Sequence, residues 1–200
     1  MKPSYQGFES KKTGGFVELP PVGAYVAEIM DVRFVQADGE TQQRDVIEMM
    51  IEITEGEYKD RYHKVYEDQK ERFGNARYRG TFRLTPPIDG DEDWRKRIFE
   101  GNLWCVEQCN PGYTWDWDEN KLKGKKIGIN VRRKLYNYTD NKTGETKEAE
   151  TTEIGKFETI SDVQAWKCKA MRDNDRRTVK VESTDGQEFT DVSAAVSVPW

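Results

Sequence analysis

The segment from Lys121 to Thr139 combines cations with aromatic rings in a chain that is acidic as a whole. It has seven Lys or Arg residues and no Asp or Glu, whereas the 200-residue chain has a formal net charge of -5. Cations attract phosphate, and an aromatic ring can stack on an unpaired base. The combination fits single-stranded nucleic acid better than a duplex or a small metabolite. An ordinary solvated strand face would use the same residue types.

The alternation within this segment is that of a β-strand, in which successive side chains point to opposite faces. One face would carry Ile127, Ile129, Val131 and Leu135. The other would carry Arg132, Lys134, Tyr136 and Tyr138. Arg133 breaks the inward set and must lie at a strand end, a bulge or an edge. We expect the apolar set to be buried and the face with rings and cations to be open.

A second stretch, Arg61 to Glu67, has a similar mixture and is predicted as another strand. Its Tyr62, Lys64 and Tyr66 would project together, and they should converge with the basic face on one groove. The tryptophans Trp115 and Trp117, which precede the basic strand, form a candidate groove edge, with one of them in the core. The predicted nucleic-acid contacts are Tyr62, Lys64, Tyr66, Lys125, Arg132, Lys134, Tyr136, Tyr138 and Trp115.

Catalytic chemistry has one weak candidate. Asp45 followed by Glu57 and Lys59 imitates the D…ExK pattern of metal-dependent nucleases, whose acids hold a divalent ion. Glu57 and Lys59 lie next to Gly56 in a predicted turn, whereas those nucleases carry them on a central strand. No phosphate-cradling Gly-rich loop or Ser/His/Asp arrangement is present. We therefore expect a protein that is not an enzyme.

The cysteines do not suggest a disulfide framework or a metal site. Cys105 and Cys109 lack CxxC spacing, and a zinc site would have to add Cys168 and the single histidine, His63, from distant segments. No apolar run approaches the roughly 20 residues of a membrane span, and the start of the chain lacks the apolar stretch of a secretory signal. We expect a cytoplasmic protein without a cofactor, a metal or membrane contact.

Five strands and one helix are predicted to position these residues. The strands cover about 24–36, 45–54, 61–67, 121–139 and 147–157, and a helix runs from about 91 to 110. The helix has an apolar stripe of Trp94, Ile98, Leu103 and Val106, and Gly155 indicates a bulge in the last strand. Residues 68–90, which are rich in Arg and aromatic residues, are predicted as a basic loop, with a short helix as an alternative.

The order of these elements is that of the oligonucleotide-binding (OB) barrel, in which a helix lies between the third and fourth of five strands. We therefore predict a mainly β, five-stranded Greek-key barrel over residues 19–165. Residues 1–18 are predicted to form a flexible arm, and residues 166–200 a tail or extension. Three alternatives stay open for the tail, namely an ordinary disordered terminus, a final strand at 179–189, or recruitment of partners through the Pro199-Trp200 tip.

Four stretches of the chain also resemble a protein family. They are LPPVGAYVAEIMDV, IEITEGEYKDRYHKVYE, EQCNPGYTWDWDENKLKGKKIGINV and TTEIGKFETISDVQ, in this order between residues 19 and 165. Their order and spacing resemble small phage-encoded single-stranded-DNA-binding proteins of recombination and replication modules. This chain departs from the family pattern at Asp60, where the family usually has Gly, and over residues 68–90. The resemblance implies cytoplasmic binding of single strands without strong sequence preference.

The expected function is therefore sequence-independent binding of single-stranded DNA by stacking and by phosphate contacts. The expected partners are single-stranded DNA and phage recombinase or replication proteins, and a homo-oligomer is compatible with the sequence. The alternative is an adaptor barrel that binds another protein, because Tyr and Arg are also enriched at protein interfaces.

Overall fold

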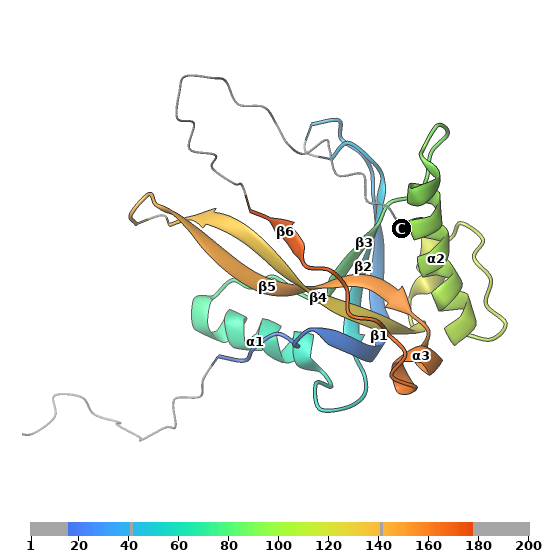
Figure 1. Ribbon diagram of the computed structural model, residues 1–200, viewed down its shortest axis with the longest axis horizontal. Coiled ribbons are helices and arrows are strands. Elements are labelled where there is room, and N and C mark those ends of the chain that lie inside the picture. The colour runs from blue at the N-terminus through green and yellow to red at the C-terminus, as the bar shows by residue number, and fades with distance from the viewer. Residues whose placement is uncertain (1–15, 41, 141, 178–200) are drawn as a thin grey trace, which may run out of the picture.

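The computed structural model describes residues 16–40, 42–140 and 142–177. Within them a six-stranded sheet packs with three α-helices, so the fold is mixed α/β rather than mainly β (Figure 1). The strands are β1 (Gly23–Val35), β2 (Val46–Ile53), β3 (Thr81–Leu84), β4 (Lys126–Thr139), β5 (Thr146–Glu158) and β6 (Asn174–Arg176). The helices are α1 (Arg61–Phe73), α2 (Asp93–Cys109) and α3 (Ile160–Gln164), with a short 3-10 helix η1 (Glu119–Leu122).

The sheet has the order β3-β2-β1-β4-β5, and all of these neighbours are antiparallel. It is an open sheet, so the predicted closed barrel is not formed by the described strands. At the seam between β3 and β5 the rings of Phe82 and Phe157 pack with their centroids 4.6 Å apart. The backbone N–H of Phe157 donates to Asn102 of α2 at 2.7 Å. A helix side chain thus satisfies a group that strand pairing would satisfy in a closed barrel.

Hydrophobic alternation explains the strands that were predicted correctly. Ile127, Ile129 and Val131 of β4 are fully buried, as expected, whereas Leu135 of the same predicted set is only half-buried. The core faces of β1 and β2 pack beside them through residues such as Ile29 and Met49. The pairing of β4 with β5 shifts at Asn130, which pairs with Lys156 while Val131 pairs with Ile154. Gly155 is therefore the extra residue of a bulge, as the sequence predicted.

The predicted third strand is wrong, because residues 61–67 begin α1. Tyr62 and Val65 are buried and Tyr66 is half-buried, and these spacings of three and four place them on one side of a helix. Glu52 of β2 accepts the backbone N–H groups of Tyr62 at 3.1 Å and His63 at 2.7 Å. This buried carboxylate satisfies donors at the start of the helix, where Asp60 forms no side-chain cap.

The third strand of the sheet lies instead at Thr81–Leu84, in the segment that was predicted as a loop. It pairs with β2, with Leu84 opposite Ile47 and Thr81 opposite Met50. Just before it, the chain passes close to the ring of Tyr62 at Gly80. A Cβ atom there would come within 2.7 Å of the ring and 2.3 Å of the Ile51 carbonyl oxygen. Only glycine leaves room for α1 to dock at this point.

The predicted apolar stripe of α2 is half wrong. Leu103 and Val106 are buried with Phe99, which is the spacing of one helix face. Trp94 and Ile98 are 45% and 52% exposed, on another side of the helix. The helix therefore uses Phe99, Leu103 and Val106 to cover the sheet and leaves Trp94 and Ile98 accessible.

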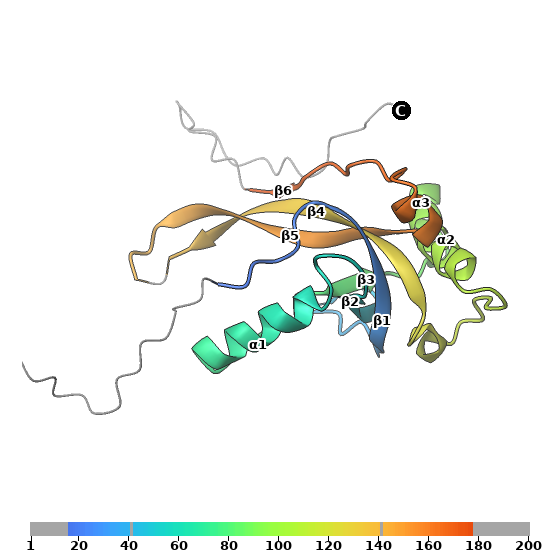
Figure 2. The same cartoon turned by 90° about the horizontal axis from the view of Figure 1, so that it is seen from below.

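The two longer helices lie at opposite ends of the molecule, as the two perpendicular views agree (Figures 1 and 2). The β4–β5 hairpin projects beyond the rest of the sheet on the same side as α1, and β6 runs beside β4. Among the described residues, no helix combines the length and apolar character needed to cross a membrane. The predicted strand at 179–189 and the tip at Pro199-Trp200 lie outside the described residues.

Candidate nucleic-acid interface

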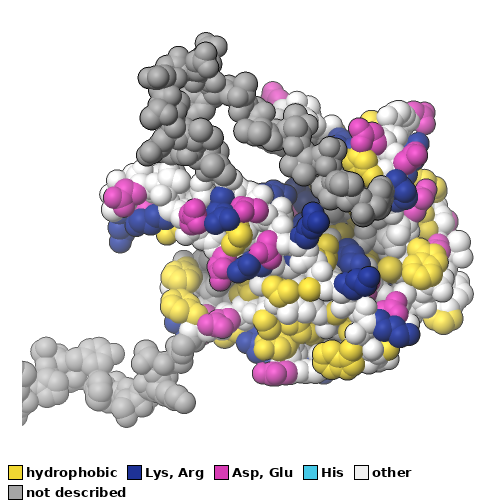
Figure 3. Space-filling view, in the orientation of Figure 1, with side chains coloured by type: hydrophobic (Ala, Val, Ile, Leu, Met, Phe, Trp, Pro, Cys, Tyr) yellow, Lys and Arg dark blue, Asp and Glu magenta, His cyan; other side chains and the backbone are white. Residues whose placement is uncertain are grey.

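A groove of about 530 Å³ lies over the open seam of the sheet, between β3, the start of α2 and the β4–β5 hairpin. Figure 3 shows Lys and Arg side chains gathered around a hollow on this face. Among the described residues, the cations that line it are Arg44, Arg77, Arg83, Arg95, Arg132, Lys134 and Arg176, and the one acidic lining residue is Glu153. Seven cations against one carboxylate make the groove strongly basic, although the chain is acidic.

An aromatic ring lies among these cations. Trp94, in the first turn of α2, is 45% exposed and lines the groove with Ile98. The guanidinium of Arg95 lies 4.6 Å from the centroid of the Trp94 ring. An exposed ring beside cations can stack on a base while the cations contact the flanking phosphates.

Two of the groove cations form ion pairs with carboxylates behind the lining. Arg44 donates two hydrogen bonds to Asp91, at 3.0 and 2.6 Å, and these lower the pKa of the Asp91 carboxyl. Arg83 of β3 donates to Glu48 of β2 at 2.7 Å, and Arg33 of β1 donates to the same carboxylate. These pairs hold the guanidinium groups at the rim of the groove.

Glu153 of β5 holds two further cations. Its carboxylate lies 2.9 Å from Arg132 and 3.3 Å from Lys134, and it accepts a 2.6 Å hydrogen bond from Asn174. Burial would raise the pKa of Glu153, but the Asn174 hydrogen bond and the charges of Lys134 and Arg132 together lower it. Glu153 is therefore ionised at neutral pH. By contrast, Arg77 and Arg176 form no ion pair within the described part of the chain.

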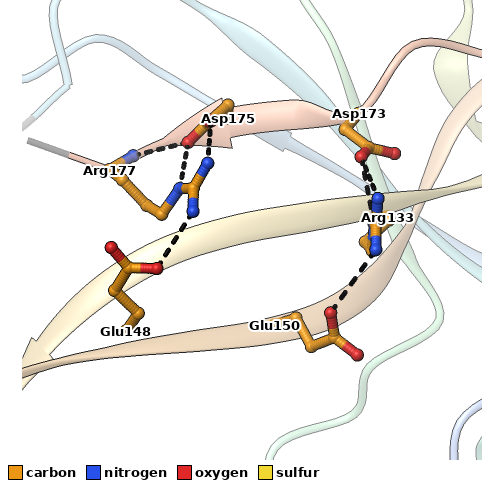
Figure 4. Close-up of polar contacts among 6 residues, drawn as sticks. All are labelled: Arg133, Glu148, Glu150, Asp173, Asp175 and Arg177. Atoms are coloured by element: carbon orange, nitrogen blue, oxygen red, sulfur yellow. Dashed lines mark hydrogen bonds and ion pairs between the residues drawn. The ribbon is translucent and has the colours of Figure 1, made fainter.

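Strand β6 brings Arg176 to the groove. It pairs in parallel with the outer half of β4, with Arg176 opposite Tyr136. Two ion-pair clusters flank the strand (Figure 4). Arg133 contacts Asp173 and, at 3.7 Å, Glu150, while Arg177 contacts Glu148 at 2.9 Å and Asp175 at 2.6 Å.

Arg133 shares a strand face with the buried residues Ile127, Ile129 and Val131, and it lies at a strand edge that β1 leaves free, one of the places where the sequence predicted it. β1 covers β4 only as far as Val131, and Arg133 follows beyond it. The backbone edge of β4 that β1 leaves free is used by β6.

A second hollow of about 390 Å³ adjoins the groove on the outer face of β1, β2 and β3. Arg77 and Thr81 line both hollows, and Arg33, Met50 and Tyr78 line only the second. The two hollows therefore meet at the edge strand β3.

Of the nine predicted contact residues, Arg132 and Lys134 line the groove. Tyr136 and Tyr138 continue along the same face of β4 toward the tip of the hairpin, where Tyr136 is half-buried and Tyr138 is 44% exposed. They lie outside the groove lining, so their role in binding stays a prediction.

The predicted convergence of the two ring-and-cation faces is wrong. Tyr62 is 1% exposed in the core, and burial raises the pKa of its phenol. Lys64 is exposed but donates to the Lys59 carbonyl at 2.8 Å, and the ring of Tyr66 packs on that of Tyr78 at 6.2 Å. None of these three belongs to the groove lining, because a helix replaces the expected strand.

The other two predicted residues lie in a separate aromatic cluster after α2. Trp115 is half-buried and packs edge-on against Phe99 at 6.4 Å, whereas Trp117 is 65% exposed. Lys125 lies over the ring of Tyr113 at 4.4 Å. As expected, one tryptophan belongs to the core, but the pair does not border the groove.

The alternative metal sites are not assembled. Asp45 precedes β2 and Glu57 follows it, so a strand of roughly 25 Å separates the two nuclease-like acids. Burial raises the pKa of the Cys105 thiol to about 11, and its Sγ lies 3.6 Å from the Phe157 carbonyl, to which it donates. Within the described ranges, no three His, Cys, Asp or Glu residues are grouped so as to hold a metal ion.

Sequence reasoning missed Arg44, Arg77, Arg83, Arg95, Arg176 and Trp94 as groove residues. Part of this set carries a sequence signal, because residues 68–90 are rich in Arg and aromatic residues. Trp94 was assigned to the core, and Arg176 reaches the groove only through the unexpected strand β6. Comparison with models of protein families and with curated proteins finds no match to this chain.

Proposed function

We propose that this protein binds single-stranded DNA in the basic groove, without strong sequence preference. The observation that supports this proposal is the groove lining, in which the part of the chain that the structure describes contributes seven cations, the exposed ring of Trp94 and one carboxylate. Backbone phosphates are the ligand that such a charge ratio favours, and an exposed ring favours a strand whose bases are unpaired.

We also propose that the sheet is an OB-type barrel that is open at one seam. The strand order β3-β2-β1-β4-β5 and the position of α2 between β3 and β4 agree with that topology. The groove lies over the seam where a closed barrel would pair β3 with β5. The helix α1, inserted between β2 and β3, is an addition to the basic pattern.

The positions of the cations indicate the path of the bound DNA strand across the protein. From the groove it can continue over Arg77 into the second hollow on the face of β2 and β3. In the other direction it can follow β4 past Lys134 toward Tyr136 and Tyr138. The resemblance to phage single-strand-binding proteins supports a role in phage recombination or replication, with proteins of those pathways as partners.

The test is a titration of fluorescent oligo(dT) followed by anisotropy at several salt concentrations. Binding should weaken steeply as salt rises, because phosphate contacts release counterions. Unchanged anisotropy at micromolar protein and low salt would overturn the proposed function. That outcome would favour the adaptor interpretation, in which a protein occupies this surface.

Two matched pairs of variants place the binding in the groove. Trp94→Ala should weaken binding by about 1 to 3 kcal/mol if the ring stacks on a base, whereas Trp166→Ala removes a 93% exposed ring outside the groove and should have little effect.

Arg77→Gln should reduce the slope of log affinity against log salt by about 0.7, the contribution of one phosphate contact. Arg79→Gln removes an exposed charge two residues away, outside the groove lining, and is the control.

A further inference from the structure

Within the described ranges, Glu153 is the one carboxylate in the groove lining, and Arg132 and Lys134 line the groove beside it. It contacts Arg132 at 2.9 Å and Lys134 at 3.3 Å. All three side chains are between 23% and 29% exposed, so solvent and a ligand can reach them. A phosphate that contacts either cation must therefore compete with this carboxylate.

We propose that Glu153 competes with DNA phosphate for Arg132 and Lys134 in the groove. In the free protein its carboxylate pairs with both cations, and this pairing limits the affinity for DNA. This inference rests on the proposed function of the groove. Two cations share one negative charge, so a phosphate that takes them must leave Glu153 without its charge partners. This exchange makes the binding free energy of each phosphate contact less favourable, so the bound DNA dissociates more readily.

Asn174 gives the displaced carboxylate a remaining partner. Its side-chain N–H donates to Glu153 at 2.6 Å from strand β6, which is tied to the hairpin by the pairs in Figure 4. An amide is neutral and does not attract phosphate as the cations do. Asn174 can therefore hold Glu153 while Arg132 and Lys134 turn to the DNA.

The variant Glu153→Gln tests the proposal, because it removes the charge and keeps the shape. Oligo(dT) should bind about three- to tenfold more tightly at about 0.1 M salt, the effect of one charge removed several ångströms from a phosphate. The dependence of log affinity on log salt should become steeper by about 0.7, because one more net cation is available to the strand.

Glu150→Gln is the matched control. Glu150 lies three residues earlier on β5, so its side chain belongs to the opposite face, where it contacts Arg133 rather than the groove. It removes the same charge from the same strand, and we expect less than a twofold change. Equal effects of the two variants would mean that only the total charge matters and would overturn the proposal.

A double-mutant cycle separates competition from a structural role. Lys134→Met should weaken binding more in the Glu153→Gln background than in the unchanged protein, because the lysine is free only in that background. Equal losses in both backgrounds, or unchanged affinity of Glu153→Gln, would overturn the inference and leave the proposed function standing. Absence of oligo(dT) binding by the unchanged protein would overturn both.

A second variant covers the case in which Glu153→Gln does not fold, which circular dichroism would reveal. Glu153→Asp keeps the charge but shortens the side chain, so the carboxylate reaches Arg132 and Lys134 less well. It should bind oligo(dT) about twofold more tightly, since the ion pairs are weakened and the charge remains. Affinity equal to that of the unchanged protein would overturn the inference.

Discussion

Helix α1 and strand β4 contain the same mixture of tyrosines and cations but use it in opposite ways. In α1 the ring of Tyr62 is buried in the core and supports the attachment of the helix to the sheet. In β4 the apolar residues Ile127, Ile129 and Val131 are buried, and Arg132 and Lys134 face the groove. Composition therefore does not decide which cations and rings become a surface for a ligand.

The spacing of the apolar residues decides the difference. In β4 they alternate, so every second side chain is left for the other face. In the segment 61–73 the inward residues recur at Tyr62, Val65 and Tyr66, which is a helical spacing. A helix turns its rings inward at intervals of three and four, and the residues between them are distributed around its outer side.

The largest expected effect that separates the two regions is the loss of the Tyr62 ring. Tyr62→Ala should lower the free energy of unfolding by about 3 to 5 kcal/mol, because it leaves a cavity in the core. Tyr138→Ala, on the outer part of β4, should change it by less than about 0.5 kcal/mol. Urea unfolding monitored by circular dichroism measures both, and similar losses for the two variants would contradict the comparison.

The attachment of α1 through Glu52 should have the next largest effect. Glu52→Gln should lower the free energy of unfolding by about 1 to 3 kcal/mol, since one oxygen that accepts backbone N–H groups becomes a donor. Glu55→Gln removes the same charge from the exposed loop after β2 and should be nearly neutral. If both variants lose the same stability, total charge and not the buried contact stabilises α1.

A smaller effect is expected at Asp60, where the chain enters α1 with a positive φ of 58°. Glycine adopts this conformation without the steric cost of a Cβ atom. The free energy of unfolding of Asp60→Gly should therefore be about 0.5 to 1 kcal/mol higher than that of Asp60→Asn, which removes the same charge and keeps the Cβ. Equal stability of the two variants in urea would show that the backbone at this entry is not strained.

The outer part of β4 should be sensitive to acid because ion pairs flank β6. The hydrogen bonds from Arg177 hold the pKa of Asp175 at about 2, below its ordinary value of 3.8. A lowered folded-state pKa stabilises the folded state above the ordinary value, and this contribution is lost as the pH falls from about 4 to about 2. NMR titration of the Asp175 carboxyl measures this, and an unshifted midpoint near 3.8 would show that the pair with Arg177 is absent.

Most of the sheet could be predicted because its strands satisfy a local rule. β2 and the inner half of β4 alternate, Gly155 marks a bulge, and the start and end of α2 have recognisable residues. The third strand could not be found in this way, because Thr81–Leu84 has only four residues and is surrounded by Arg and aromatic residues. Residues 61–67 have the composition of β4, but the spacing of Tyr62, Val65 and Tyr66 is that of a helix.

The candidate site was predictable only in its β4 part. Arg132 and Lys134 belong to a recognisable strand face, whereas Trp94 and Arg95 depend on how α2 rotates against the sheet. Arg176 depends on a three-residue strand that no local pattern indicates, since the edge of β4 is free beyond Val131 only because β1 begins at Gly23. Such positions follow from packing between distant segments, which a single sequence does not reveal.

The sequence alone determined that a basic, ring-bearing strand with a buried apolar face exists in an acidic chain, because charge and alternation are local properties. It also determined the order of four strands and of the helix that precedes β4. The tertiary structure decided that the seam between β3 and β5 stays open, that the groove lies over this seam, and that one carboxylate, Glu153, faces its cations. These features arise because packing of α2 and β6 brings together residues from β3, α2, β4, β5 and β6, and only the folded chain determines their distances.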